Sequence, residues 1–367
     1  MKQVYLLLFI SIFFSCKNEK EEKTDAKSGA TKVVKKLHYE NERHLKNIRQ
    51  LTFGGDNAEA YWSFDDKSLV FQASNHWNLE CDQIFTMPVD TNLEHDHAIP
   101  QMISTGKGRT TCSYFLPGDS TIVYSSTHLA DINCPPVPKK EDHGGKYIWP
   151  VYSGFDIFVA DLKGNQLKQL TTTDGYDAEP TVSPKGDLIV FTSLRTGDLE
   201  LYTMNIDGTD VKQVTNGLGY DGGAFFSPDG TKLVFRSSRP KTDEEIKEYK
   251  DLLTQGLVKP TNMELYICNI DGSELTKITD LGSANWAPFF HPSGEKIIFS
   301  SNHKNKTVPF NLYMINIDGT GLEQITFDPI FDSFPMFSYD GKQLVFSSNR
   351  NNGGNHDTNL FVADWVD

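Results

Sequence analysis

The stretch SPDGTKLVFRSSR at residues 227–239 decides the fold, because variants of it recur along the whole chain. In each copy, a small polar turn is followed by an apolar run that ends near a serine. A repeat of this length cannot bury its apolar face alone, so the copies must stack on one another. The turns read SFDDKS (63–68), LPGDST (116–121), SPKGD (183–187), SPDGTK (227–232), HPSGEK (291–296) and SYDGKQ (338–343).

One copy without an insertion spans residues 177–215. Its segment DAEPTV is a short strand, and the turn SPKGD leads into LIVFTS, a continuous apolar run typical of a buried strand. LELYTMNI alternates apolar and polar residues, Asp207-Gly208 is a hairpin turn, and VKQVT closes the unit as an edge strand. Four antiparallel strands in about 40 residues predict one blade of a β-propeller.

The two ends of the repeat region complete each other. The segment HLKNIRQLT at 44–52 is a closing strand with no blade before it, and NLFVADWVD at 359–367 ends after a third strand. Joining them pairs edges that would otherwise stay open. The sequence therefore predicts an all-β fold over residues 44–367, a six-bladed β-propeller whose last blade is closed by the N-terminal strand.

The N-terminus has the pattern of an export signal. Lys2 precedes an apolar stretch, so residues 1–15 are expected to be a signal peptide, and FFSC resembles a bacterial lipobox with Cys16 as the lipidated residue. Residues 16–43 are charged and read as a flexible tether. Their KNEKEE run resembles surface-export signals of Bacteroidetes lipoproteins. We expect an outer-membrane lipoprotein in the cell envelope, either on the periplasmic side or at the cell surface.

The repeats also resemble a known family. SPDGTKLVFRSSR and LYTMNIDGTDVKQVT (201–215) are similar to TolB-type propeller repeats, and the resemblance covers about residues 44–367. It implies the six-bladed architecture and a partner-binding role. The same repeats resemble the accessory propeller of prolyl-oligopeptidase-like peptidases.

Charge and cysteine content narrow the class of partner. The chain has 367 residues and a formal charge of −14 with no basic stripe, which argues against nucleic acid. An exported chain can form disulfides. A bridge between two of Cys81, Cys112 and Cys134 is expected, with the pair left open, and Cys268 is expected to be a buried free thiol. We expect a monomer that contacts the membrane through its lipid only.

Two insertions are expected on one face of the propeller, at about 128–153 and 240–262. Both fall between the second and third strands of a blade, and insertions gathered on one face usually mark the binding face. The second has the helical spacing of Ile246, Tyr249 and Leu252, with Gly256 as a stop, so a short amphipathic helix is expected there. Such a helix either takes part in binding or only covers apolar surface.

A polar residue recurs near the start of each innermost strand, and in several blades this residue, or the one two positions later, is acidic. Six-fold placement would bring them round the mouth of the central channel, where carboxylates could hold Ca²⁺ or bind a cationic group. Alternatively, they bond backbone amides at strand starts. No other cofactor is predicted, and the identity of any metal is left open. The candidate ligands are Glu59, Asp177, Glu179, Asp221 and Asp332.

A basic residue follows the second strand of several blades on the same face. These side chains could meet a carboxylate or phosphate ligand, or could form ion pairs with the acids of neighbouring blades. The candidate basic face consists of His128, Arg195, Arg239, His303 and Arg350.

Aromatic residues gather in the first insertion and at one blade tip. Tyr147, Trp149 and Trp286 could form a platform for sugar rings or a peptide, or could pack the long loop onto its blade.

Motifs for catalysis are missing from the chain. It contains no G-x-S-x-G elbow, P-loop, H-E-x-x-H or paired CxxC. The sequence therefore favours a membrane-anchored envelope propeller that binds a protein, peptide or glycan through its loop-rich face without catalysis. The alternative is a metal-assisted hydrolase or lyase that uses Asp177, Asp221 and Asp332 at the channel mouth.

Overall fold

The repeat unit at residues 177–215 folds as a four-stranded antiparallel sheet. The computed structural model describes residues 37–91 and 99–367. The run LIVFTS is buried from its second residue onward, whereas both residues of the closing strand are exposed. Gly186 takes the left-handed conformation that the turn requires, with φ of +71°. The strands of this blade, blade 3, are β11 (Asp177–Val182), β12 (Leu188–Ser193), β13 (Glu200–Asn205) and β14 (Lys212–Gln213).

The described residues form six such sheets, which we number as blades 1 to 6 along the chain. Blade 1 contains β2 (Asp56–Trp62), β3 (Ser68–Ser74), β4 (Gln83–Pro88) and β5 (Gln101–Met102). Blade 2 contains β6 (Thr110–Phe115), β7 (Thr121–Ser126), β9 (Asp156–Asp161) and β10 (Gln166–Gln169). Blade 4 contains β15 (Asp221–Phe226), β16 (Lys232–Ser237), β18 (Glu264–Asn269) and β19 (Thr276–Lys277). Blade 5 contains β20 (Asn285–Phe290), β21 (Lys296–Ser301), β22 (Asn311–Asn316) and β23 (Glu323–Gln324).

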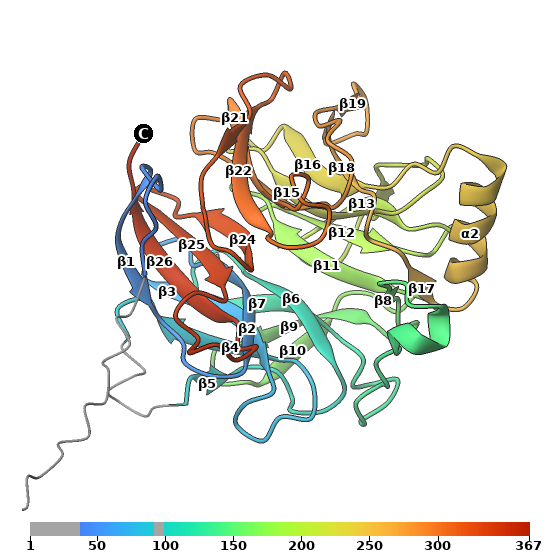
Figure 1. Cartoon of the computed structure of the whole chain (residues 1–367). Coiled ribbons are helices and arrows are strands. Elements are labelled where there is room, and N and C mark those ends of the chain that lie inside the picture. Colours follow the sequence, from blue (N-terminus) through green and yellow to red (C-terminus); the bar gives the residue numbers. More distant parts are fainter. Residues whose placement is uncertain (1–36, 92–98) are drawn as a thin grey trace, which may run out of the picture. The chain divides into compact units, whose positions relative to one another are not determined.

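Blade 6 joins the two ends of the described chain. Its inner strands are β24 (Asp332–Phe337), β25 (Gln343–Ser348) and β26 (Asn359–Trp365), and its outer strand is β1 (Leu45–Gln50). Antiparallel pairing places Leu45 opposite Trp365 and Gln50 opposite Phe361. Figure 1 shows the blue β1 beside the red β26. The six-bladed β-propeller closed by its N-terminal strand is therefore confirmed.

The chain packs on the propeller before residue 44, where the sequence predicted that the tether ends. Glu42 is fully buried and forms an ion pair with Arg350 of blade 6, with Oε1 and Nη2 3.0 Å apart. The chain is thus already packed on the propeller before β1 begins. The predicted signal peptide, Cys16 and most of the tether lie outside the described residues. Within the described ranges, no helix has the length and apolar character needed to cross a bilayer.

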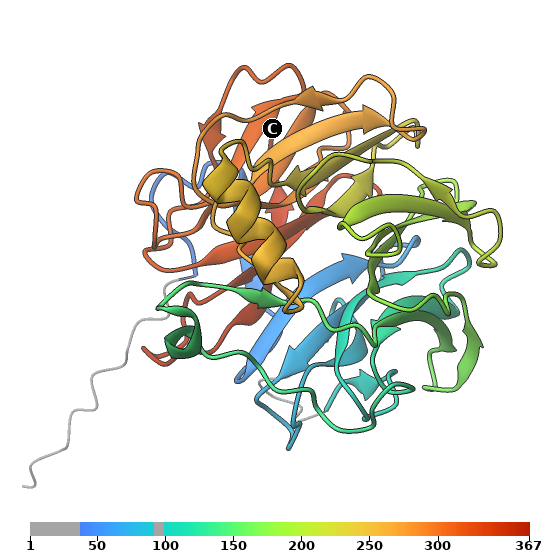
Figure 2. The same cartoon turned by 90° about the vertical axis from the view of Figure 1, so that its right-hand side faces the viewer.

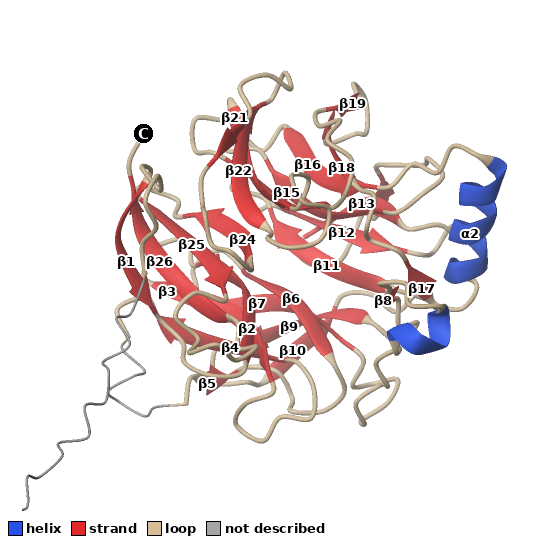
Figure 3. Ribbon diagram, viewed as in Figure 1, coloured by secondary structure: helices blue, strands red, loops and turns tan. Residues whose placement is uncertain are grey.

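The two insertions pair with each other over one face. β8 (Trp149–Pro150) of the first and β17 (Leu257–Val258) of the second form a two-stranded antiparallel sheet. The predicted helix is present as α2 (Asp243–Leu253), with Tyr249 and Leu252 buried, and the first insertion adds the 3-10 helix η1 (Lys140–His143). Figure 2 looks onto α2 and the green η1 segment in front of the sheets, and Figure 3 shows these two helices in blue close together.

The paired insertions, residues 128–153 and 240–262, are called the lid from here on. Glu248 on α2 accepts hydrogen bonds from Lys146 of the first insertion and Lys259 of the second. Ile148, Leu252 and Leu257 form a small apolar cluster beneath them. Contacts of both kinds tie the insertions into one body, although they arise from different blades.

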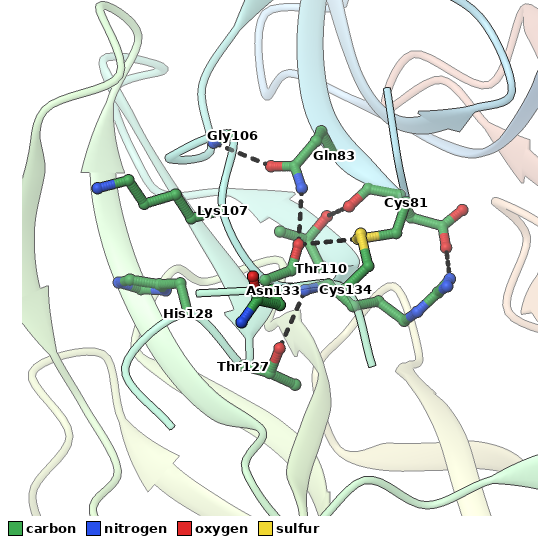
Figure 4. The surroundings of a disulfide bond; sticks show 12 residues. Cys81, Gln83, Gly106, Lys107, Thr110, Thr127, His128, Asn133 and Cys134 are labelled. Carbon is green, nitrogen blue, oxygen red and sulfur yellow. Dashed lines mark hydrogen bonds and ion pairs between the residues drawn. A yellow bond between two sulfur atoms is a disulfide. The ribbon is translucent and has the colours of Figure 1, made fainter. Parts of the chain in front are cut away.

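A disulfide fixes one end of the lid. Cys81 of blade 1 is bonded to Cys134 of the first insertion (Figure 4), which settles the pair that the sequence left open. Around it, Gln83 donates to the carbonyl of Gly108 and accepts from the amide of Gly106. Cys112 and Cys268 are free, and Cys268 is buried as expected.

Candidate functional site

A β-bulge interrupts the innermost strand of every blade at the same place. The strand pairing shifts register there, and one residue per blade has a positive φ between 43° and 60°. This conformation costs a residue other than glycine about 1–2 kcal/mol, and a bulge turns its extra side chain to a new direction. We call these residues the bulge ring: Glu59, Cys112, Glu179, Gly223, Ala287 and Phe334.

All members of the bulge ring line one cavity of about 660 Å³, the central cavity. Its lining includes Tyr61 and Phe225, whose ring centroids are 5.8 Å apart. The lid contributes Trp149 and Val258 to its lining. The cavity is therefore lined by residues of all six blades and of the lid.

Glu179 is the most strongly bonded member of the bulge ring. Its carboxylate forms an ion pair with Arg236 of β16. It also accepts hydrogen bonds from Thr192 Oγ1 at 2.7 Å, from Tyr220 OH at 2.9 Å and from the Gly223 amide at 2.9 Å. Burial alone would raise the pKa of Glu179, but the Arg236 guanidinium and these donors hold that pKa below its usual value. Glu179 is thus a fixed negative charge.

Gly223 leaves room for this ion pair. A Cβ at position 223 would overlap Nη1 of Arg236. Arg236 reaches the inner strand because its neighbour there has no side chain. On its other side, its guanidinium lies 5.4 Å from the ring of Trp149 and 5.1 Å from that of Tyr220.

Glu59 has a different environment from Glu179. The thiol of Cys112 donates to its Oε2, with sulfur and oxygen 3.0 Å apart. No ion pair is found for Glu59 among the described residues. Burial is the largest cause that raises its pKa to about 7, helped by the charge of Glu179. The same position in two blades therefore holds one ionised carboxylate and one carboxyl that titrates near neutral pH.

A second ion pair lines the cavity wall, between Arg109 and Asp82. Gln72 lies nearby on β3 and accepts a hydrogen bond from the Cys112 amide at 3.2 Å. These polar groups lie on the side of the cavity formed by blades 1 and 2.

The three predicted platform residues lie together. Trp149 and Trp286 have ring centroids 5.0 Å apart, and Tyr147 is 6.4 Å from Trp149 and 6.3 Å from Trp286. All three line the central cavity, and the Tyr147 side chain is 41% exposed at its mouth. Trp286 also donates its indole N–H to the Pro260 carbonyl at 2.9 Å, which ties blade 5 to the lid.

Three predicted acids point away from the cavity. Asp177, Asp221 and Asp332 are almost fully buried and pair with Arg195, Arg239 and Arg350, with N–O distances of 2.5–3.1 Å. Each ion pair lies within one blade, not between neighbouring blades as expected. The cause is strand geometry: the aspartate and the bulge residue two positions later do not share a direction, so only Glu59 and Glu179 of the predicted acids reach the cavity.

The predicted basic residues share one bonding pattern in the blades. The backbone amides of four of them, His128, Arg195, His303 and Arg350, each donate to the hydroxyl of a serine two residues earlier. Burial lowers the pKa of both His128 and His303, which favours neutral imidazoles. None of the five predicted bases lines the central cavity.

Calcium does not fit the predicted acids as they are placed. Asp177, Asp221 and Asp332 belong to separate blades, and each is neutralised by its own arginine. Across the described residues, no group of three or more His, Cys, Asp or Glu side chains is placed to hold a metal ion.

Several cavity residues were not identified from the sequence, although a signal for them exists. Cys112 occupies the repeat position of Glu59 and Glu179. Arg236 and Gln72 occupy a position in the second strand where the other copies have serine or threonine. These are positions at which the six copies differ, and their side chains line the cavity.

Comparisons with known proteins agree with the fold. Residues 152–243 match the family described as the TolB beta propeller domain. The TolB structure from Agrobacterium tumefaciens is similar at 19% identity and a TM-score of 0.54, over 85% of this chain and 91% of that one. TolB from Acinetobacter baumannii is similar at 18% identity and a TM-score of 0.50, over 85% of this chain and 64% of that one.

A third similar structure is an enzyme. Oligogalacturonate lyase from Vibrio parahaemolyticus has 12% identity and a TM-score of 0.50, over 86% of this chain and 93% of that one. A search of curated proteins gives no match. At these identities the solved structures support the six-bladed TolB-type fold alone.

Proposed function

Starting from a TolB-type propeller with a roofed cavity, we propose that this chain is a ligand-binding protein of the cell envelope, anchored through a lipid on Cys16. Its ligand is a short peptide or oligosaccharide, alone or as part of a larger partner. The ligand enters the central cavity beneath the lid. The single observation that carries this proposal is the meeting of Tyr147, Trp149 and Trp286 at one polar-walled cavity.

The size and lining of the cavity support this ligand class. A volume of about 660 Å³ lies within the range of small-molecule sites, which combine aromatic walls with a few polar groups. Indole and phenol rings offer flat apolar faces for sugar rings or peptide side chains. Glu59, Gln72 and Arg109 add donors and acceptors that fix orientation.

Two further observations support the envelope. The N-terminal residues have the pattern of an export signal. The disulfide between Cys81 and Cys134 suits an oxidising compartment and holds the lid that covers the cavity.

The test measures the binding of defined peptides and oligosaccharides to the full-length chain by tryptophan fluorescence and calorimetry. Trp149→Ala should weaken binding at least tenfold. Trp365→Ala is the matched control, because Trp365 ends β26 and contacts His291 in a turn on the opposite face, outside the cavity lining. Equal affinity of the wild type and Trp149→Ala for every ligand that binds would place the site elsewhere.

A further inference from the structure

We infer that the ligand group held in the central cavity carries an ammonium ion, and that Glu59 is its counter-ion. This inference deepens the proposed function and rests on it. An amino sugar and a peptide amine share this chemistry.

The charges that line the cavity do not balance. Four acids face two bases: Asp56, Glu59, Asp82 and Glu179 against Arg109 and Arg236. Each arginine already has a carboxylate partner, Asp82 for Arg109 and Glu179 for Arg236. The cavity is therefore short of positive charge, and a cationic ligand would correct this.

Glu59 is the acid placed to receive that cation. Its one hydrogen-bond partner in the described parts of the chain is the Cys112 thiol, a weak donor bound to Oε2. Its Oε1 has no partner there. The bulge at position 59, with φ of +53°, turns the side chain into the cavity despite the cost of this conformation.

The walls of the cavity suit an ammonium ion as well. The side chains of Tyr147, Trp149, Tyr220 and Trp286 line it, and the negative faces of aromatic rings attract cations. The protein already uses this interaction within the same wall, because Arg236 lies over Trp149 and Tyr220. Aromatic rings together with one unpaired carboxylate are the usual surroundings of a bound ammonium group.

Titration of Glu59 provides an independent readout. The groups that act on its pKa are Cys112, Glu179, Arg236 and Asp82, in addition to burial. Because the pKa of Glu59 is raised to about 7, part of the empty protein holds a proton there at neutral pH. An ammonium ion beside the carboxylate would lower this pKa, so binding would release a proton.

The experiment uses matched pairs of probes with the full-length chain. One pair is a glucosamine trimer and its N-acetylated form, and the other is a lysine tetrapeptide with an acetylated N-terminus and the same capped peptide with acetyl-lysine. At pH 8, the ammonium member of at least one pair should bind at least tenfold more tightly than its neutral partner. The pair that shows this preference identifies the source of the ammonium group.

Variants then assign the preference to Glu59. Glu59→Gln should reduce it below about twofold and remove the proton release seen by calorimetry in buffers of different ionisation enthalpy at pH 7. Glu295→Gln, in the exposed turn between β20 and β21 and outside both the lid and the cavity lining, should keep both. Cys112→Ala removes the thiol but keeps the carboxylate, so it should also keep the preference.

Two results would overturn the inference. One is equal affinity within both pairs, and the other is a preference that survives Glu59→Gln. If neutral probes bind without a charge preference and Trp149→Ala weakens them, the proposed function stands while the ammonium inference fails. If no probe of either pair binds, the inference fails, and the wider ligand panel described above decides the proposed function separately.

Discussion

The indole ring of Trp149 lies 5.4 Å from the guanidinium carbon of Arg236. Trp149 belongs to the lid and arises from blade 2, whereas Arg236 belongs to blade 4 and neutralises Glu179 of blade 3. One contact therefore joins the lid to the charged wall of the cavity. The shape of the site depends on this ion pair.

Removing Arg236 should destabilise the whole propeller. The Arg236 and Glu179 side chains are each 10% exposed, and loss of one partner leaves a buried charge that costs about 3–5 kcal/mol. We expect Arg236→Ala to lower the free energy of unfolding by that amount, measured with urea. Lys67→Ala is the control, since Lys67 is 80% exposed in its ion pair with Asp65 and should cost less than about 1 kcal/mol. Similar losses in the two variants would contradict this account.

Even the small side chain of alanine at position 223 should destabilise the protein. Gly223→Ala places a Cβ against Arg236 and also adds a methyl group at a positive φ. Gly118→Ala shares the positive φ, at +85°, but its Cβ would meet no atom within 4 Å. The difference between the two variants isolates the clash, and we expect Gly223→Ala to be less stable by about 1–3 kcal/mol in urea unfolding. Equal stabilities would show that Arg236 moves aside without cost.

The blades could be predicted from the sequence because each blade forms through contacts between residues that are close together in the chain. A small polar turn, a buried apolar run and a closing strand are recognisable in each copy, so the fold, ring closure and α2 could all be predicted. The direction of a side chain at a bulge is different. Asp177 and Glu179 are two residues apart, and a regular strand would point both the same way. The bulge at Glu179 turns this side chain into the cavity, whereas Asp177 stays bound to Arg195.

Contacts between distant insertions were beyond prediction for a related reason. The pairing of Val258 with Trp149 joins segments more than a hundred residues apart, and each strand has only two residues, too short for a periodic signal. The aromatic residues could be selected by type, but their meeting point depended on this pairing.

The disulfide should stabilise the lid side of the propeller. Cys81 and Cys134 are 53 residues apart, and closing a loop of that length is worth about 2–4 kcal/mol. We expect the variant Cys81→Ala/Cys134→Ala to lose this amount in urea unfolding. Dithiothreitol should lower the stability of the wild type to a similar level and leave the variant unchanged. A wild type that is insensitive to full reduction would show that the lid contacts hold the loop without the bridge.

Glu59 should make stability fall as pH rises toward neutral. The pKa of its carboxyl is about 7 in the folded protein against 4.5 in water, so the unfolded chain loses this proton first. The stabilising contribution is complete below about pH 4.5, declines between about 4.5 and 7, and is lost above 7. Glu59→Gln cannot ionise and escapes this loss. We expect its Tm to match that of the wild type near pH 4.5 and to exceed it by about 2 °C or more at pH 8, in thermal scans without ligand. Glu295→Gln, in the exposed turn between β20 and β21, should give a difference that stays flat with pH. A flat difference for Glu59→Gln as well would mean that water or another group already stabilises the ionised carboxylate.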